Sequence, residues 1–200
     1  MPEQIKEQTK ELKVDDIKAA AEEKGCPVQK ALYFVNEFLA GPMCGRCFPC
    51  MMGSYEARIR LQNLVEGRGS DADVLALGRI AADMVEASFC KKGKDTGRFI
   101  LDWIATGVYK EHAEGHCPDM QCQALIEYRI IPGKCISCGA CKNACKFLAI
   151  HGEQGKSYKS GYLPFEIRQL RCTRCGECIK VCPTGAVVLV AAKASEPVGV

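Results

Sequence analysis

Two stretches that repeat one another decide the fold of this sequence. Residues 135–145 read CISCGACKNAC and residues 172–182 read CTRCGECIKVC, and their first cysteines lie 37 residues apart. A short apolar segment follows each stretch. Internal duplication of this kind predicts two copies of one small unit related by a pseudo-two-fold axis, within a domain of short helices and strands.

The cysteines of each stretch have the spacing C-x2-C-x2-C-x3-C, which is typical of domains that bind two 4Fe-4S clusters. Three closely spaced thiolates can hold three corners of one cluster, whereas the fourth cysteine enters a short helix that points toward the other cluster. Two complete runs in tandem do not have zinc-finger spacing, which disfavours a pair of zinc sites. We therefore expect two cross-ligated clusters, one held by Cys135, Cys138, Cys141 and Cys182, the other by Cys172, Cys175, Cys178 and Cys145.

A third set of cysteines lies in the first half of the chain. Residues 41–53 read GPMCGRCFPCMMG, so Cys44, Cys47 and Cys50 again follow one another at two-residue intervals. A fourth ligand must come from elsewhere, and Cys90, at the end of a predicted helix, is the candidate. A loop and a helix end that meet across a bundle are a common way to seat a cofactor. The spacing favours a third 4Fe-4S cluster over a zinc site or free thiols.

The cysteine count limits the classes of protein that remain. The chain has 15 cysteines among 200 residues, an odd number that cannot pair completely, and its polar N-terminus lacks the apolar core of a signal peptide. We therefore expect the reducing cytoplasm, where cysteines bind metal rather than form disulfides. A formal net charge of +3 gives no electrostatic case for nucleic acid or an anionic membrane. No apolar run approaches the ~20 residues that a membrane span needs.

Hydrophobic periodicity divides the chain into a helical first part and a mixed second part. Residues 1–27 read as a charged N-terminal arm, 28–113 as a four-helix iron–sulfur bundle, 114–123 as a linker and 124–200 as a ferredoxin-like domain. Helices are expected at 28–40, 49–65, 70–85 and 99–110, with a capping box at Ser70 and Asp73 and a turn at 91–95. Strands are expected at 124–131, 148–151, 161–165 and 187–190. The predicted fold class is α+β.

Three cysteines remain outside the three sets, namely Cys26, Cys117 and Cys122. Cys117 and Cys122 lie in the predicted linker, just after His112 and His116. Two thiolates and the imidazole of His112 suit a structural zinc ion, with Cys26 or His116 as the fourth ligand. The competing interpretation is that these are ordinary buried thiols and surface histidines, and the two stand equal on the sequence.

Two motifs carry a resemblance to a known family. CGRCFPC at residues 44–50, followed by SFC at 88–90, is similar to the iron–sulfur helical bundle of the NADH-oxidising flavin subunit of respiratory complex I. HAEGHCPDMQCQALIEYRI at residues 112–130, followed by the cysteine repeat, resembles the diaphorase-like subunits of soluble electron-bifurcating hydrogenases and formate dehydrogenases. The chain departs from the family motif ESCGKCTPCR where residues 42–43 read PM and residues 51–52 read MM.

The three cysteine sets, together with the resemblance, predict an electron-transfer subunit with three 4Fe-4S clusters, and we expect it to have no catalytic site of its own. Its implied partners are a flavin subunit that handles NAD(P)H, a small thioredoxin-like 2Fe-2S subunit and a catalytic oxidoreductase subunit. The family's flavin and nucleotide domain carries glycine-rich phosphate loops, and we expect this chain to lack them. Two alternatives remain: a free-standing ferredoxin-like carrier, and a relay paired with an FAD-dependent, glutamate-synthase-like NADPH subunit.

Overall fold

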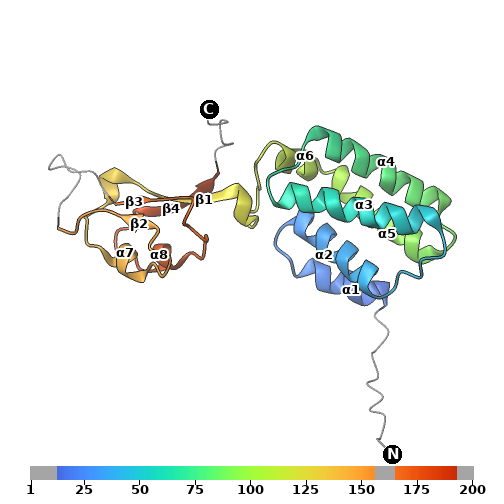
Figure 1. Cartoon of the computed structure of the whole chain (residues 1–200), viewed down its shortest axis with the longest axis horizontal. Coiled ribbons are helices and arrows are strands. Elements are labelled where there is room, and N and C mark those ends of the chain that lie inside the picture. Colours follow the sequence, from blue (N-terminus) through green and yellow to red (C-terminus); the bar gives the residue numbers. More distant parts are fainter. Residues whose placement is uncertain (1–12, 156–164, 193–200) are drawn as a thin grey trace, which may run out of the picture. The chain divides into compact units, whose positions relative to one another are not determined.

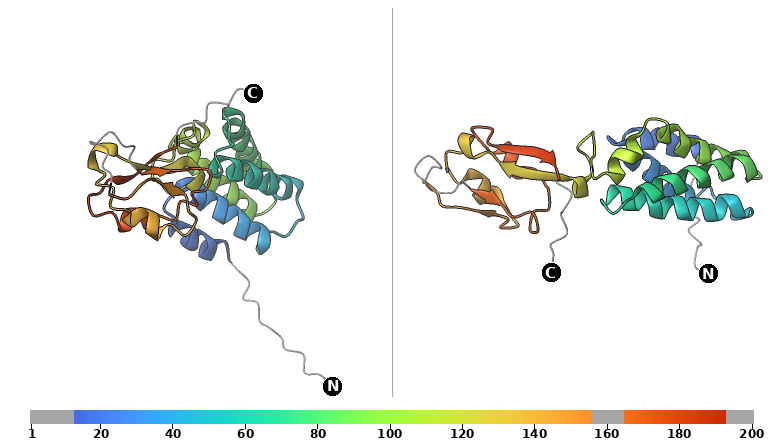
Figure 2. Two further views of the ribbon diagram at one scale, coloured as in Figure 1. Left: turned by 60° about the vertical axis from the view of Figure 1, so that its left-hand side comes forward. Right: turned by 90° about the horizontal axis from the view of Figure 1, so that it is seen from above.

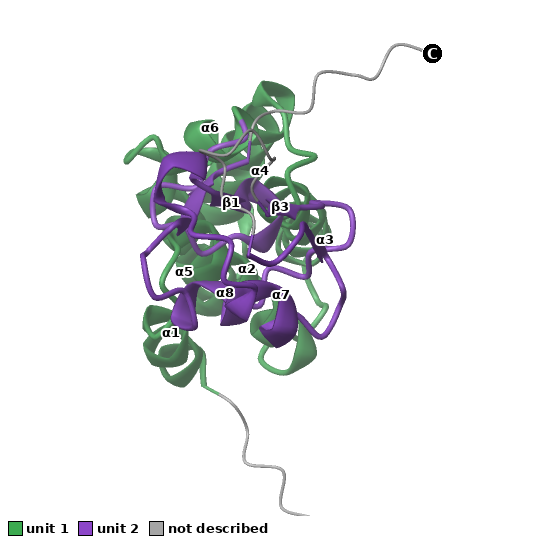
Figure 3. Ribbon diagram, turned by 90° about the vertical axis from the view of Figure 1, so that its left-hand side faces the viewer, with its two compact units in different colours: residues 1–114 green, residues 115–200 purple. Residues whose placement is uncertain are grey.

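The computed structural model describes residues 13–155 and 165–192 of the chain. It divides into two compact units, Met1–Glu114 and Gly115–Val200 (Figures 1 and 3). The described part of the first unit is helical, whereas that of the second combines short helices with two small sheets. The fold class is therefore α+β, as predicted. None of the helices in the described residues is both long and apolar enough to cross a membrane.

Six helices form the first unit within its described residues. Proline stands in the first turn of the second and third helices, where its fixed φ and missing N–H suit a helix start. The predicted capping box is confirmed, because the Asp73 carboxylate accepts from the backbone N–H of Ser70 at 3.0 Å. The helices are α1 (Val14–Glu22), α2 (Pro27–Ala40), α3 (Phe48–Val65), α4 (Asp71–Ala87), α5 (Lys91–Ile104) and α6 (Val108–Ala113).

The helix prediction was wrong in three places. Residues 14–22, expected in a charged arm with solvated and frayed helices, form a helix, α1, that packs against α2 and buries Ile17 and Ala21. Residues 91–95, expected as a turn, are the start of α5. The helix expected at 99–110 is divided between α5 and α6, because the chain takes a left-handed conformation at Gly107 with φ 80°. The described part of the unit is thus a six-helix rather than a four-helix assembly.

Close packing of α4 on α5 fixes the geometry of the first unit. A Cβ added to Gly97 of α5 would lie 2.6 Å from the backbone oxygen of Ala81 in α4, so this approach requires glycine. Helix α4 also contacts α3 along its other side (Figure 2). The rings of Phe34 and Phe99 stack with centroids 4.4 Å apart and join α2 to α5. This arrangement holds the start of α5 beside the start of α3.

The second unit shows the internal repeat directly. Strands β1 (Ile126–Ile130) and β4 (Val187–Ala191) pair antiparallel, as do β2 (Ile150–His151) and β3 (Glu166–Ile167). Helices α7 (Ala140–Ala144) and α8 (Glu177–Lys180) follow equivalent positions of the two cysteine stretches. Single 3-10 turns at Gln123–Leu125 and Pro132–Lys134 flank β1. Three predicted strands are confirmed, whereas the one at 161–165 lies mostly outside the described residues and β3 follows it.

Candidate metal centres

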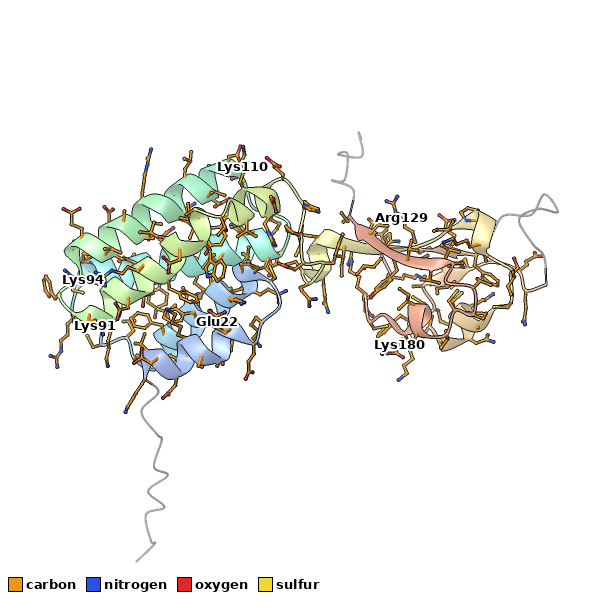
Figure 4. The ribbon with its side chains drawn as sticks, turned by 180° about the vertical axis from the view of Figure 1, so that it is seen from behind. Glu22, Lys91, Lys94, Lys110, Arg129 and Lys180 are labelled. Atoms are coloured by element: carbon orange, nitrogen blue, oxygen red, sulfur yellow. The ribbon has the colours of Figure 1, made fainter. Side chains whose placement is uncertain are left out.

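Two helix starts carry three of the four cysteines of the set predicted in the first unit. Cys47 is the residue before α3 and Cys50 lies in its first turn, whereas Cys90 is the residue before α5. The N–H groups in the first turn of a helix have no partner within the helix and favour negative charge there. Lys91 and Lys94 add positive charge at the start of α5 (Figure 4). Cys47 therefore lies at a helix start that favours negative charge, and its pKa is lowered.

The four thiols predicted to act together lie within electrostatic reach of one another. Burial raises the pKa of the Cys50 thiol to about 11, and the neighbouring Cys47, Cys90 and Cys44 thiols contribute to that rise. Conversely, the backbone N–H groups of Phe89 and Cys50 donate to the Cys47 sulfur and lower its pKa. Four converging thiols that oppose one another's ionisation suit a cationic iron–sulfur centre, which compensates the repulsion between thiolates.

The second unit contains two cavities lined by cysteine. One cavity is lined by the first predicted set, Cys135, Cys138, Cys141 and Cys182, and the other by the second, Cys145, Cys172, Cys175 and Cys178. Each cavity thus collects three cysteines from one stretch and one from the other. The cysteine that each stretch contributes to the other cavity is Cys145 or Cys182. Backbone amides at equivalent positions donate to both, from Ala149 to Cys145 Sγ at 3.3 Å and from Ala186 to Cys182 Sγ at 3.2 Å.

Burial and amide hydrogen bonds act differently on the thiols of the second unit. Burial raises the pKa of Cys141, and together with the nearby Cys172 it raises the pKa of Cys178 to about 11. Burial also opposes ionisation of Cys182, but the backbone amides of Val187 and Thr184 outweigh it and lower the pKa. The buried thiols are therefore poor thiolates without a cation, which fits their use as ligands of an iron–sulfur centre.

A separate group of candidate ligands surrounds His112. Its Nδ1 lies 2.8 Å from the carbonyl oxygen of Val108, which can only accept, so the ring proton sits on Nδ1. Nε2 then presents its lone pair, 3.3 Å from the Cys26 sulfur. The ligand atoms of Cys26, His112, Cys117 and Cys122 all lie within 4.8 Å of one another, and all four side chains are buried. His116 is outside this group.

Sequence reasoning missed one polar residue beside the cysteines of the first unit. Ser88 is buried, and its hydroxyl oxygen has no hydrogen-bond partner among the described residues. The sequence offered a signal, because Ser88 stands two positions before Cys90 in the SFC motif. The packing of α4 and α5 brings Ser88 next to the ligand cysteines, and the sequence alone does not indicate this packing.

Family models match both units. Residues 30–114 match the NADH-ubiquinone oxidoreductase-F iron–sulfur binding region, and residues 134–186 match a 4Fe-4S dicluster domain. The first range contains Cys44, Cys47, Cys50 and Cys90, and the second contains the two repeated stretches. The resemblance stated from the motifs is confirmed.

Curated relatives share part of this chain. It is 31% identical over 134 residues to the NADP-reducing hydrogenase subunit HndC of Solidesulfovibrio fructosivorans, which is 66% of this chain and 27% of the relative. The NADH-quinone oxidoreductase F chain of Streptomyces coelicolor is 32% identical over 94 residues, 46% of this chain and 21% of the relative. The beta subunit of the NADP(+)-dependent formate dehydrogenase of Moorella thermoacetica is 30% identical over 74 residues, 37% of this chain and 10% of the relative. The chain therefore spans about a quarter or less of these proteins.

Proposed function

We propose that this chain, which joins an NADH-ubiquinone oxidoreductase-F iron–sulfur binding region to a 4Fe-4S dicluster domain, relays electrons through three 4Fe-4S clusters. It is an iron–sulfur electron-transfer subunit related to hydrogenase and formate dehydrogenase subunits. In our proposal it connects a flavin-binding subunit that handles NAD(P)H with a catalytic subunit of a larger oxidoreductase. The observation that carries the proposal is that twelve cysteines form three groups of four.

The protein's own residues bind and tune the clusters. A 4Fe-4S cluster, when bound, takes up and releases one electron. The first ligand set is Cys44, Cys47, Cys50 and Cys90, the second Cys135, Cys138, Cys141 and Cys182, and the third Cys172, Cys175, Cys178 and Cys145. Amide groups that donate to ligand sulfurs, as Phe89 does to Cys47, stabilise negative charge and so favour reduction. Burial of Cys50, Cys141 and Cys178 limits access of water.

The partners follow from the relatives. Two of them are named for NADP and one for NADH and quinone, which supports a pyridine nucleotide at one end of the electron path. We further propose a thioredoxin-like 2Fe-2S subunit in the assembly, electron bifurcation at the flavin, and an anaerobic, cytoplasmic setting. A chain rich in thiols and exposed cluster ligands such as Cys44 and Cys90 requires reducing conditions.

We propose that the group around His112 holds one structural zinc ion. Three thiolates and one imidazole make a complete tetrahedral set of the Cys3His type. The ligands are Cys117, Cys122, His112 and, in place of His116, Cys26. The hydrogen bond from His112 Nδ1 to Val108 orients the ring, as the outer partner of a metal-bound histidine commonly does.

Anaerobic purification from the native source tests the proposed assembly. We expect a flavin-containing subunit to remain bound through size exclusion and to pass electrons from NADH or NADPH to the iron–sulfur clusters, measured as bleaching of their visible absorbance. A bound flavoprotein with FAD and a glutamate-synthase-like sequence would instead support the alternative in which this chain is paired with such an NADPH subunit. A chain that elutes alone and accepts electrons from several unrelated reductases would contradict the subunit role and favour the free-standing carrier.

A further inference from the structure

The hydroxyl group of Ser88 stands out among the buried polar groups near the first ligand set. Its side chain is 3% exposed, and Oγ has no hydrogen-bond partner in the described part of the chain. Buried hydroxyl groups nearly always have a partner, because an unmet donor or acceptor loses its bonds to water. We therefore expect that, in the working protein, a group outside the described residues accepts a hydrogen bond from the Ser88 hydroxyl.

The position of Gly93 shows where the hydroxyl points. A Cβ built on Gly93 would lie 2.7 Å from Ser88 Oγ and 3.0 Å from Cys50 Sγ. The hydroxyl oxygen and the ligand sulfur thus flank one small space, which stays open because residue 93 has no side chain. The neighbouring amide of Phe89 donates to Cys47 Sγ, so the segment before Cys90 is held against the ligand loop.

Helix capping does not explain the orientation of Ser88. Its backbone N–H already closes the end of α4 by donating to the Met84 oxygen at 3.2 Å. The buried hydroxyl of Thr96 offers a contrast on α5, since it donates to the Lys92 carbonyl oxygen at 3.0 Å within its own helix. Of these two hydroxyl groups, only that of Ser88 faces the ligand cysteines without a partner among the described residues.

We propose that Ser88 donates its hydroxyl hydrogen to a sulfur atom of the cluster held by Cys44, Cys47, Cys50 and Cys90 and thereby raises the reduction potential of that cluster. Reduction adds negative charge to the cluster, and a donor bonds more strongly to the more negative sulfur. The hydrogen bond therefore stabilises the reduced form more than the oxidised form. Ser88 would contact the cluster directly, and its assignment rests on the proposed first ligand set.

Removal of the hydroxyl group tests the proposal in the full chain with its clusters in place. Ser88→Ala should lower the equilibrium constant for reduction of the first cluster by about three- to tenfold, which is ~30–60 mV for a one-electron couple. The measurement is an EPR-monitored redox titration of anaerobic protein. The signal of the first cluster is identified as the one that Cys90→Ala removes.

Two variants serve as matched controls. Ser88→Thr keeps the hydroxyl group and should leave the potential close to that of the unaltered protein. Thr96→Val removes a buried hydroxyl group whose partner lies in its own helix, and should not shift the potential. The two ferredoxin-type signals should keep their potentials in all three variants, because neither Ser88 nor Thr96 belongs to the unit that contains their ligands.

The outcomes separate this inference from the function on which it rests. An unchanged potential in Ser88→Ala, with iron retained, would overturn the role of Ser88. If the alanine variant loses the cluster, Ser88→Gly is titrated instead, and an unchanged potential there has the same meaning. Absence of the first signal from the unaltered protein, with iron for only two clusters, contradicts the proposed ligand set itself.

Discussion

The two units gather their cysteines in different ways. In Gly115–Val200 the two sets come from two copies of one cysteine stretch, and each set takes its fourth cysteine from the other copy. Equivalent amides of Ala149 and Ala186 donate to these two fourth cysteines, Cys145 and Cys182. In Met1–Glu114 three cysteines come from one loop and helix start, whereas Cys90 arrives 40 residues after Cys50 at the start of α5. The first arrangement follows from the cysteine spacing of the repeat, which is typical of sets that exchange their fourth ligands. The second depends on how α4 and α5 pack.

Loss of Cys90, the ligand farthest along the chain from the rest of its set, should have the largest effect on the clusters. Cys90→Ala removes the only ligand of the first set that stands at the start of α5, and a 4Fe-4S cluster with three protein ligands is readily lost. We expect iron to fall from about 12 to about 8 per chain, at four per cluster. Iron analysis and EPR on anaerobic protein measure this. Unchanged iron and spectra would show that another residue completes the set.

The exchanged cysteines of the second unit provide the next largest effect. Cys145→Ser should perturb the cluster bound by Cys172, Cys175 and Cys178, because Cys145 lines that cavity. The cluster of Cys135, Cys138 and Cys141 should remain largely intact. EPR of the reduced variant decides, with Cys138→Ser and Cys175→Ser as reference spectra. A match to Cys138→Ser would mean that each stretch holds its own cluster.

Substitutions in the group around His112 should affect the zinc content of the protein but not its iron content. Replacing both Cys117 and Cys122 with Ser should release about one zinc ion per chain and leave the iron content unchanged. The thermal midpoint should fall by several degrees, because a bound structural metal contributes folding free energy. Elemental analysis and calorimetry test this together. Unaltered protein free of zinc after expression in zinc-replete medium would rule the site out.

A pair of glycines tests whether helix packing builds the first site. Gly97→Ala places a Cβ 2.6 Å from the Ala81 oxygen and should reduce the free energy of unfolding by about 1–3 kcal/mol. Gly78→Ala on α4 is the control, since its Cβ would meet Ile104 Cδ1 at an ordinary 3.7 Å. It should stabilise the helix by about 0.5–1 kcal/mol. Urea unfolding measures both. Equal effects of the two variants would mean that α4 and α5 tolerate a wider spacing.

The capping box at the start of α4 gives the smallest expected effect and a pH dependence. Burial opposes ionisation of Asp73, but hydrogen bonds from Ser70 and Arg60 outweigh it and lower the pKa. The stabilisation is therefore complete above the pKa of ~3.9 in the unfolded chain and is lost as pH falls through the lower folded value. Ser70→Ala should cost about 1 kcal/mol at neutral pH and less in acid, measured by urea unfolding. An equal cost at both pH values would contradict this origin.

The parts that the sequence predicted have either local interactions or a cysteine spacing that is typical of a known type of site. Short β-type runs predicted strands at 124–131 and 187–190, and the structure has them at 126–130 and 187–191. The capping box spans only Ser70 to Asp73. The packing of α1 was missed because its charges suggested a solvated arm, whereas only Ile17 and Ala21 of this helix are buried. The start of α5 was missed because its lysines read as a turn. The place of Ser88 depends on α4 and α5 together and has no local signal beyond the SFC motif.

A count of iron and acid-labile sulfide in anaerobically prepared protein tests the central claim most directly. Three complete cysteine sets predict about 12 iron and about 12 sulfide per chain, at four of each per cluster. The protein should also be brown, with the broad visible absorbance of sulfur-to-iron charge transfer. A count near eight of each would contradict the site formed by α3 and α5. A colourless protein with zinc in place of iron would contradict the electron relay altogether.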